Sequence, residues 1–255
     1  MTKLTIAPDK LLSEEQGLDE KATRTTSRGR TAVRLNARPG LSEKAGKPKT
    51  GKRVPRQRRR PEEARELIIK AALECFGAFG FEGTSTRAVA ERAEVTHTLV
   101  LYYFESKDRL WTSTIEYVLK AYLEEISQLF VDVNEHNAQS VLFVYIEKFV
   151  RLSAQYPQVH RILTMEGNSK SDRMYWVIEK FIKNMFDNVT KIIKIGQDAG
   201  RIRQCDPARL YYYIISAGGT PFTLATEYHA NTGRDIFSEP EILRTIAFIY
   251  EFALP

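Results

Sequence analysis

The sequence has few cysteines and no long apolar run, and these absences exclude several classes of protein. Cys75 and Cys205 are the two cysteines in 255 residues, too few for a disulfide-stabilised secreted domain or a cysteine-rich zinc site. No apolar stretch approaches the roughly 18–20 residues that a membrane-spanning helix needs. The N-terminus lacks the charged and apolar regions of a secretory signal. These features favour a protein of the reducing cytoplasm.

The sequence motifs of common enzymes are also missing. It contains no glycine-rich phosphate-binding loop, no nucleophile elbow and no paired metal-ligand motif. His136, His160 and His229 are scattered, without the spacing of a metal site. We therefore expect no enzyme activity, no cofactor and no bound metal.

Aromatic residues are absent from the first 60 positions, although the chain has 27 of them. The same segment holds 17 Lys and Arg against 6 Asp and Glu, whereas residues 61–255 hold 21 against 26. Such a segment buries too little apolar surface to offset the entropy cost of ordering it. The composition predicts a disordered basic tail over 1–60 that precedes a slightly acidic body.

The basic tail suggests nucleic acid or another anionic surface as a partner. The alternative is a solvated tail without a dedicated partner. If the tail binds the DNA backbone, deleting residues 1–55 is expected to lower the slope of log affinity against log salt, because fewer phosphate contacts release fewer counterions. DNA titrations at several salt concentrations measure this slope, and an unchanged slope would contradict the idea.

From Pro61 onward, apolar residues recur at helical spacing. Asp206-Pro207 fits a helix start, Ser238 and Glu241 fit a capping box, and the Gly218–Pro221 segment predicts a kink. No segment predicts a strand. The sequence therefore predicts an all-α fold of about nine helices. Their expected ranges are 61–80, 86–92, 97–103, 106–126, 141–152, 157–165, 175–200, 207–230 and 240–253.

Two of these helices are short and lie close together. An N-cap cluster at residues 84–86 opens the helix that ends near Arg92, and Thr96 caps the helix from His97 to about Tyr103. Two short helices joined by about three residues form a helix-turn-helix, whose second helix enters the major groove of DNA.

This region resembles the DNA-binding domain of TetR-family transcriptional regulators over about residues 64–111. The likeness rests on three matches, the segment Gly83–Ala93, Thr96, and the segment Leu101–Lys107. Beyond residue 115 it rests on helix number and order. Leu-Tyr-Tyr-Phe-x-Ser-Lys, Tyr156-Pro157-Gln158 and Met165-Glu166 are also similar to the pyrimidine-utilisation repressor branch, from which we infer no ligand.

The sequence departs from the family in the turn, where Glu94 stands in place of the usual glycine. Glycine suits a backbone position that requires a positive φ. We expect Glu94 to adopt that conformation at modest cost and to lie outside the DNA contact zone.

The resemblance implies three parts: a basic tail (1–60), a helix-turn-helix DNA-binding domain (61–107), and a helical effector-binding and dimerisation domain (108–255). It implies a sequence-specific repressor that a small molecule releases from a palindromic operator. It also implies a homodimer formed by the last two helices, with small residues at 216–220 permitting close approach. The alternative is an architectural DNA-binding protein without a small-molecule ligand.

Hydroxyl groups near the two short helices predict the DNA contacts. Hydroxyls and free N–H groups at a helix N-terminus suit phosphate, although simple capping explains the same residues. The first turn of the second helix is placed to contact base edges. Phosphate contacts are expected from Thr84, Ser85, Thr86, Tyr102, Tyr103 and Lys107, and base contacts from Thr96, His97, Thr98 and Leu99. One tyrosine packing in the core and a merely solvated His97 are the alternatives.

An effector pocket is expected to combine aromatic side chains with a few polar groups. The candidates are Tyr145, Met165, Glu166, Trp176 and Phe181, with Glu166 as the polar group. Ordinary core packing is the alternative for each of them.

Overall fold

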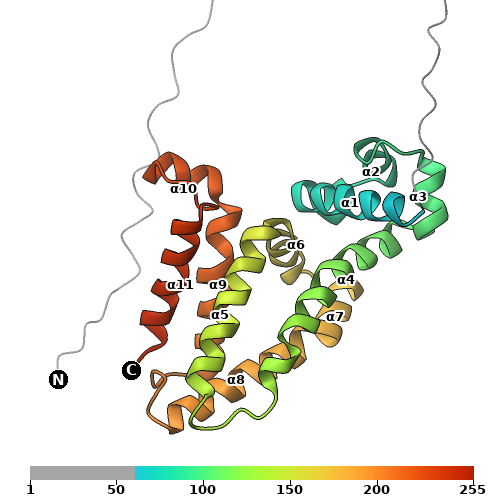
Figure 1. Cartoon of the computed structure of the whole chain (residues 1–255). Helices are drawn as coiled ribbons and strands as arrows, with labels where there is room; N and C mark the ends of the chain where they lie inside the picture. Colours follow the sequence, from blue (N-terminus) through green and yellow to red (C-terminus); the bar gives the residue numbers. More distant parts are fainter. Residues whose placement is uncertain (1–60) are drawn as a thin grey trace, which may run out of the picture. The chain divides into compact units, whose positions relative to one another are not determined.

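The computed structural model describes residues 61–255, which are helical and contain no strand (Figure 1). The predicted all-α fold is thus confirmed over this range, and the predicted tail over 1–60 lies outside it. No described helix is long and apolar enough to cross a membrane. The helices are α1 (Pro61–Gly83), α2 (Thr86–Arg92), α3 (His97–Phe104), α4 (Lys107–Ile126), α5 (Ala138–Gln155), α6 (Pro157–Gly167), α7 (Asp172–Val177), α8 (Lys183–Asp198), α9 (Pro207–Thr223), α10 (Ala225–Thr232) and α11 (Glu239–Ala253).

Side-chain caps fix the starts of several helices, as the sequence predicted. Ser85 Oγ accepts a hydrogen bond from the Ala88 amide, and Ser106 Oγ accepts one from the Arg109 amide. Thr96 caps α3 in the same way, and Asp206 accepts from two amides at the start of α9. These caps satisfy amides that have no partner within the helix.

Three helix predictions were wrong in detail. The expected helix 207–230 is divided at Leu224 into α9 and α10, just after the Gly218–Pro221 segment where a kink was expected. The expected helix 175–200 begins at Asp172 and includes a π-helical segment, η2 (Ile178–Ile182), between α7 and α8. The first helix breaks at Gly80 (φ 68°) as expected, but helical hydrogen bonding resumes as far as Gly83.

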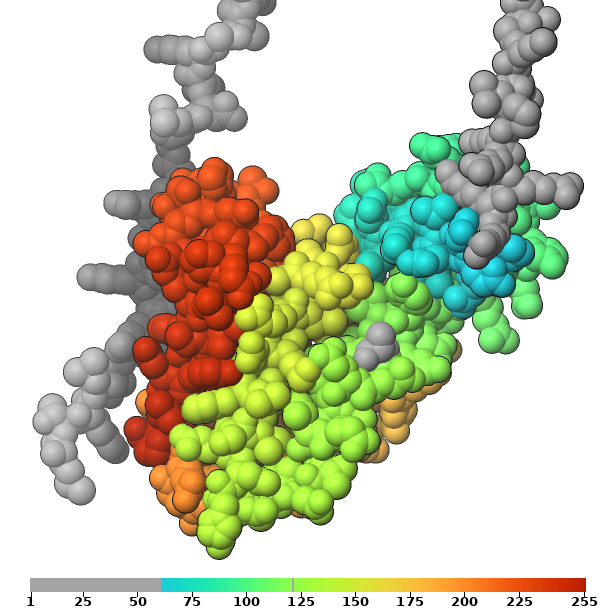
Figure 2. All heavy atoms as spheres, in the orientation of Figure 1, coloured from blue at the N-terminus to red at the C-terminus, as the bar shows by residue number. Residues whose placement is uncertain are grey.

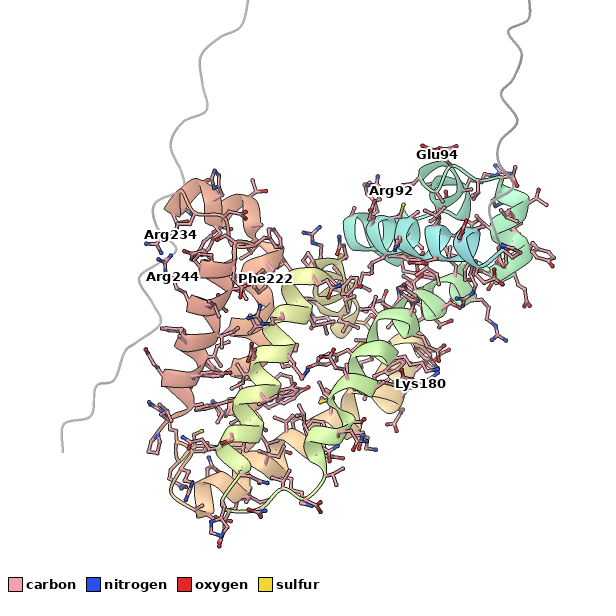
Figure 3. The ribbon with its side chains drawn as sticks, in the orientation of Figure 1. Arg92, Glu94, Lys180, Phe222, Arg234 and Arg244 are labelled. Atoms are coloured by element: carbon pink, nitrogen blue, oxygen red, sulfur yellow. The ribbon has the colours of Figure 1, made fainter. Side chains whose placement is uncertain are left out.

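The predicted capping box at the start of α11 is also wrong. Ser238 makes no side-chain cap, and its hydroxyl donates instead to the Asp235 carbonyl at 2.7 Å. The buried Glu241 carboxylate accepts a hydrogen bond from the Tyr228 hydroxyl at 2.6 Å and pairs with Arg244. These contacts lower the pKa of Glu241 and bind α10 to α11. Figure 3 shows Arg244 and Arg234 beside each other near this end of α11.

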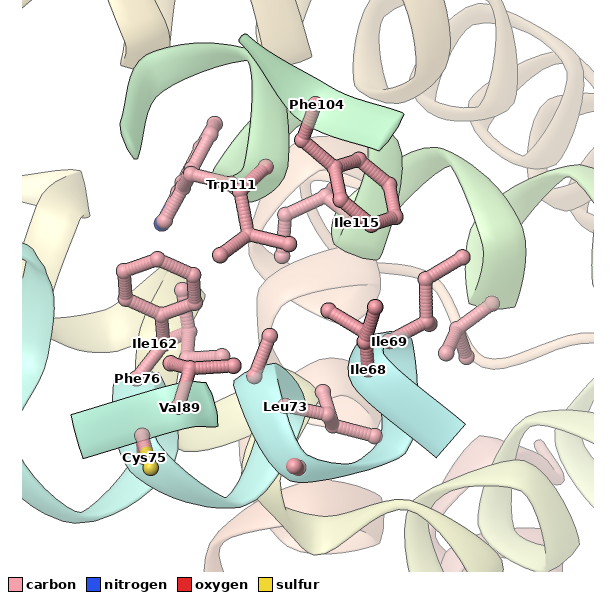
Figure 4. Packing of buried hydrophobic residues seen from close by; sticks show 14 of the residues in the cluster. Ile68, Ile69, Leu73, Cys75, Phe76, Val89, Phe104, Trp111, Ile115 and Ile162 are labelled. Atoms are coloured by element: carbon pink, nitrogen blue, oxygen red, sulfur yellow. The ribbon is translucent and has the colours of Figure 1, made fainter. Parts of the chain in front are cut away.

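The first hydrophobic cluster joins the N-terminal helices to the rest of the described chain. Phe76 of α1, Val89 of α2 and Phe104 of α3 pack with Trp111 of α4 and Ile162 of α6 (Figure 4). Cys75 is buried in the same cluster, as expected of a packing residue, and burial raises the pKa of its thiol. One close-packed core therefore includes α1–α4 and α6, so α6 packs against the helices that carry the helix-turn-helix.

The second cluster lies mainly among α5, α8, α9 and α11. Two glycines of α9 allow other helices to pack closely against it. A Cβ at Gly218 would lie 3.0 Å from the Phe149 ring, and one at Gly219 would lie 2.3 Å from Nδ1 of His160. Both glycines are buried. Their expected role in close approach to a second copy is therefore wrong, because they let α9 approach α5 and α6 of the same chain.

Candidate nucleic-acid interface and ligand cavity

The exposed face of α3 is the central feature of the candidate nucleic-acid interface. Thr98, Leu101 and Tyr102 are exposed at positions i, i+3 and i+4, so they lie on one side of the helix. Tyr102 is 78% exposed, and the capping Thr96 is exposed at the start of the helix. Leu101 was missing from the predicted set, although its spacing from Thr98 was a signal that could have identified it.

The structure brings three other predicted residues together at the starts of α2 and α3. Thr86 Oγ1 lies 2.9 Å from Nε2 of His97, which joins the first turn of α2 to the first turn of α3. Ser85, exposed, caps α2 beside this pair. His97 is half-buried and hydrogen-bonded rather than simply solvated, so α2 fixes the orientation of its ring.

Four predicted contacts are engaged or turned inward. Thr84 is 2% exposed and its hydroxyl donates to the Gly80 carbonyl at 2.8 Å; this burial excludes it from our candidate phosphate contacts. Leu99 is half-buried. Tyr103 packs partly against the first core and donates to the Pro61 carbonyl at 3.0 Å. Lys107 Nζ lies 4.2 Å from the centroid of the Phe81 ring, a cation–π contact that occupies it within the protein.

The turn between α2 and α3 has the conformation that the sequence predicted. Glu94 has a φ of 53° and is exposed, a left-handed conformation that costs a residue with a Cβ roughly 1–2 kcal/mol. The Val95 amide donates to the Ala90 carbonyl at 3.0 Å across this turn. Arg92, just before it, pairs with Glu74 of α1 and holds α2 against α1 (Figure 3).

A cavity of about 550 Å³ lies among α4, α5, α6, α7, η2, α8 and α9. Its lining is largely apolar, and its volume falls within the roughly 300–1,000 Å³ of small-molecule sites. Tyr145 and Phe181 are in the lining, as predicted. One face of α6 forms part of the lining and contributes Val159, His160, Leu163, Thr164 and Gly167.

The other three predicted effector residues lie outside that lining. Met165 is exposed, while Trp176 packs edge-on against Trp111 with ring centroids 6.5 Å apart. Glu166 is buried on another side of α6, where its Oε2 accepts hydrogen bonds from the hydroxyls of Ser169 and Ser171. These predictions were wrong as cavity residues because Met165 and Glu166 do not lie on the helical face that lines the cavity.

Arg173 of α7 occupies the space between the cavity wall and the N-terminal helices. Its guanidinium lies 3.5 Å from Glu166 of α6 and 3.6 Å from Asp108 of α4. It also lies 3.5 Å from the centroid of the Phe81 ring of α1. The Arg173 side chain is 20% exposed, and its neighbour Met174 lines the cavity. One side chain thus links α1, α4, α6 and α7.

Two family comparisons cover most of the described chain. Residues 68–112 match the family described as "Bacterial regulatory proteins, tetR family". Residues 140–252 match the "Tetracyclin repressor-like, C-terminal domain". The first match contains α2 and α3, and the second contains α5–α11 with much of the cavity lining.

Individual relatives agree with these matches. The HTH-type transcriptional regulator RutR of Escherichia coli (strain K12) is 27% identical over 182 residues, which are 71% of this chain and 84% of RutR. The HTH-type transcriptional regulatory protein RaaS of Mycobacterium tuberculosis is 27% identical over 169 residues, covering 66% of this chain and 74% of RaaS.

Solved structures share the fold at lower identity. HlyIIR, a hemolysin II transcriptional regulator, superposes with a TM-score of 0.53 at 22% identity, covering 74% of this chain and 98% of HlyIIR. The regulator FadR of Bacillus subtilis, solved with stearoyl-CoA, gives a TM-score of 0.54 at 16% identity, covering 73% and 98%. With the helix-turn-helix of α2 and α3, these findings show that the chain belongs to the TetR family, whose members are DNA-binding transcriptional regulators and not enzymes.

Proposed function

We propose that this regulator is a repressor whose affinity for its operator is set by a small molecule in the cavity. The observation that carries the proposal is the position of α6, which lines the cavity with one face and packs on α1 with another. Arg161 of α6 donates to the Gly77 carbonyl of α1 at 3.4 Å. A Cβ at Gly77 would lie 2.7 Å from Gln158, so α1 and α6 are in close contact.

This contact gives an occupied cavity a route to the helix-turn-helix. A ligand that fits better when α6 is displaced favours a conformation in which α1, and with it α3, is displaced too. Such a ligand shifts the population only by its difference in affinity for the two conformations. An architectural protein needs no cavity of this kind, which favours the effector-responsive alternative.

The proposed DNA contacts follow the exposure of each side chain. We assign Ser85, Thr86 and Tyr102 to backbone phosphates, since hydroxyl groups commonly bind there. Tyr103 would first have to break its hydrogen bond to Pro61, and Lys107 its cation–π contact with Phe81. We therefore place both outside the primary DNA contacts. The proposed contacts to base edges are Thr96, His97, Thr98 and the added Leu101, and the half-buried Leu99 is left out of them.

We also propose a homodimer formed through α11 and α9. Leu243 and Phe248 are exposed on α11, and Tyr212 is exposed on α9. Figure 2 shows α10 and α11 (red) at the surface on the side away from α1–α3. A two-fold dimer matches a palindromic operator with half-sites about 34–36 Å apart. We also propose that this DNA-binding protein acts in the cytoplasm.

Selection of random DNA fragments by the purified full-length protein tests the proposal. At about 150 mM salt, we expect sequencing of the bound fragments to yield an enriched palindrome. Genes that lie beside copies of this palindrome in the genome would then suggest candidate effectors. Absence of an enriched motif, with binding that disappears as salt rises, would favour the architectural alternative instead.

Replacing Tyr102 with phenylalanine tests the phosphate contact on α3. We expect operator affinity to fall roughly three- to tenfold, the value of one hydrogen bond, and to fall equally on all sequences, because phosphate carries no sequence information. Fluorescence anisotropy with the selected operator and with variant sites measures both effects. The control is Tyr175→Phe, since Tyr175 is also exposed but lies on α7. If the Tyr102→Phe variant binds the operator as tightly as the wild-type protein, the Tyr102 hydroxyl does not contact phosphate.

A further inference from the structure

We propose that the cavity takes an uncharged, largely apolar molecule with a hydrogen-bond acceptor such as a carbonyl oxygen, and that Tyr122, Tyr145 and Tyr211 donate to this acceptor. The inference rests on the proposed function only in treating the cavity as the effector site. It adds the chemical class of the ligand and the groups that recognise it.

The three tyrosines come from different helices and meet at the cavity. Tyr122 lies on α4, Tyr145 on α5 and Tyr211 on α9, and all three line the cavity. Their phenol groups lie close enough for each pair to influence a pKa: Tyr211 acts on Tyr122, and both act on Tyr145. A ligand in the cavity therefore meets these three tyrosines within a largely apolar wall.

The Tyr122 hydroxyl needs a partner that the described chain does not supply. Tyr122 is 8% exposed, and its hydroxyl oxygen is buried without a hydrogen bond to any of residues 61–255. Leaving a buried hydroxyl unsatisfied costs about 1–3 kcal/mol, and native proteins satisfy nearly all such groups. A ligand that accepts this hydrogen bond recovers that cost, whereas a purely apolar ligand does not.

The protonation of these tyrosines makes them donors. Burial raises the pKa of Tyr122 and Tyr145 well above the ordinary value, and raises the pKa of Tyr211 to about 12. All three hydroxyl groups therefore keep their protons at neutral pH. A protonated phenol has one O–H to donate, and the O–H of Tyr122 has no acceptor among the described residues, so an acceptor on the ligand would satisfy it.

The charges around the cavity favour a neutral ligand. The lining contains no carboxylate, and its one cationic side chain, Lys183, is exposed and pairs with Glu179 at 3.6 Å. Burial lowers the pKa of His160, so its imidazole is neutral at pH 7. An ionised group deep in this cavity would have no opposite charge beside it, since Lys183 is exposed and already pairs with Glu179. Burying an unpaired charge is strongly unfavourable.

Three fluorescent probes test both parts of the proposal on the full-length protein. Prodan is uncharged and has a carbonyl acceptor, N-phenylnaphthylamine is uncharged without a carbonyl, and anilinonaphthalene sulfonate adds a negative charge. We expect both uncharged probes to bind more tightly than the sulfonate. We expect Tyr122→Phe to weaken Prodan roughly three- to tenfold and to leave N-phenylnaphthylamine unchanged. Bound Prodan should emit at shorter wavelength in this variant, because its carbonyl has lost a hydrogen bond.

The Tyr175→Phe variant, which alters an exposed tyrosine outside the lining, is the matched control, and thermal unfolding checks that each variant is folded. Tyr145→Phe and Tyr211→Phe should repeat the selective loss of Prodan. Failure of Prodan to bind, equal weakening of both uncharged probes, or tighter binding of the sulfonate would overturn the proposal. Because no DNA is used, these outcomes are separate from the operator selection, whose failure would instead contradict the proposed function.

Discussion

Replacing Phe248 with glutamate is expected to convert the protein into monomers and to lower its affinity for a palindromic operator by roughly one hundred- to ten-thousandfold. Phe248 is 63% exposed on α11. In a two-fold interface the same substitution occurs on both subunits, so two carboxylates would be buried without partners. The large effect on DNA follows because two linked helix-turn-helix domains bind the two half-sites together, whereas a monomer binds one.

The substitution should leave the fold intact because α11 has a separate buried side. Ile242, Ile246 and Ile249 face the second hydrophobic cluster, while Phe248 does not belong to it. Light scattering during size-exclusion chromatography measures the mass, and anisotropy titrations compare a single half-site with the full palindrome. Half-site affinity should stay the same.

Tyr175→Glu provides the control, since it places the same carboxylate at another exposed aromatic position, on α7. It should remain dimeric and bind the full operator normally. If the Phe248→Glu protein remains dimeric, the exposed face of α11 around Phe248 is not the dimer interface.

The helix-turn-helix was predictable because its signals are local. Ser85 and Thr96 each cap a helix by accepting a hydrogen bond from an amide three residues away. Such contacts depend only on a short segment of sequence. The positive φ at Glu94 was also predictable, since it belongs to a turn of a few residues. The burial of Thr84 was not predicted, because the N-cap pattern does not show that its hydroxyl instead donates to the Gly80 carbonyl.

The cavity was only partly predictable, because its lining comes from distant segments. Tyr145 and Phe181 were identified, but Tyr122 and Tyr211 were not. Periodicity marks all of these positions as apolar and inward, and it does not distinguish a cavity wall from close-packed core. The same limit applies to Gly218 and Gly219, whose small size indicates close approach but not which helix approaches.

Replacing Arg173 with methionine is expected to uncouple the cavity from the helix-turn-helix. Allosteric coupling is reciprocal, so operator DNA should change the affinity for a cavity probe by the factor with which the probe changes operator affinity, typically about 5–150-fold. We expect a factor in this range for Prodan and the wild-type protein, and a factor near one for Arg173→Met. The measurement is a Prodan titration with and without saturating operator DNA.

The physical reason lies in what Arg173 joins. Its guanidinium pairs with Glu166 at the end of α6 and with Asp108 at the start of α4. Methionine keeps an unbranched apolar stem over the Phe81 ring, whereas the charge that holds α6 to α4 is lost. Glu166 keeps its hydrogen bonds from Ser169 and Ser171, which limits the loss of stability.

Lys180→Met is the matched control. Lys180 also combines an ion pair, with Glu116 at 2.7 Å, and a contact with an aromatic ring, Trp176 (Figure 3). Its ion pair joins η2 to α4 rather than α6 to α4, so its loss should leave the Prodan–operator coupling unchanged. Asp108→Asn breaks one of the ion pairs that Arg173→Met removes, so it should lower the coupling less than Arg173→Met does. The double variant should show no loss beyond that of Arg173→Met, because the Asp108 pair is already absent there. Equal losses in the Lys180 and Arg173 variants, or an unchanged factor in Arg173→Met, would show that coupling passes through the packed face of α6 instead.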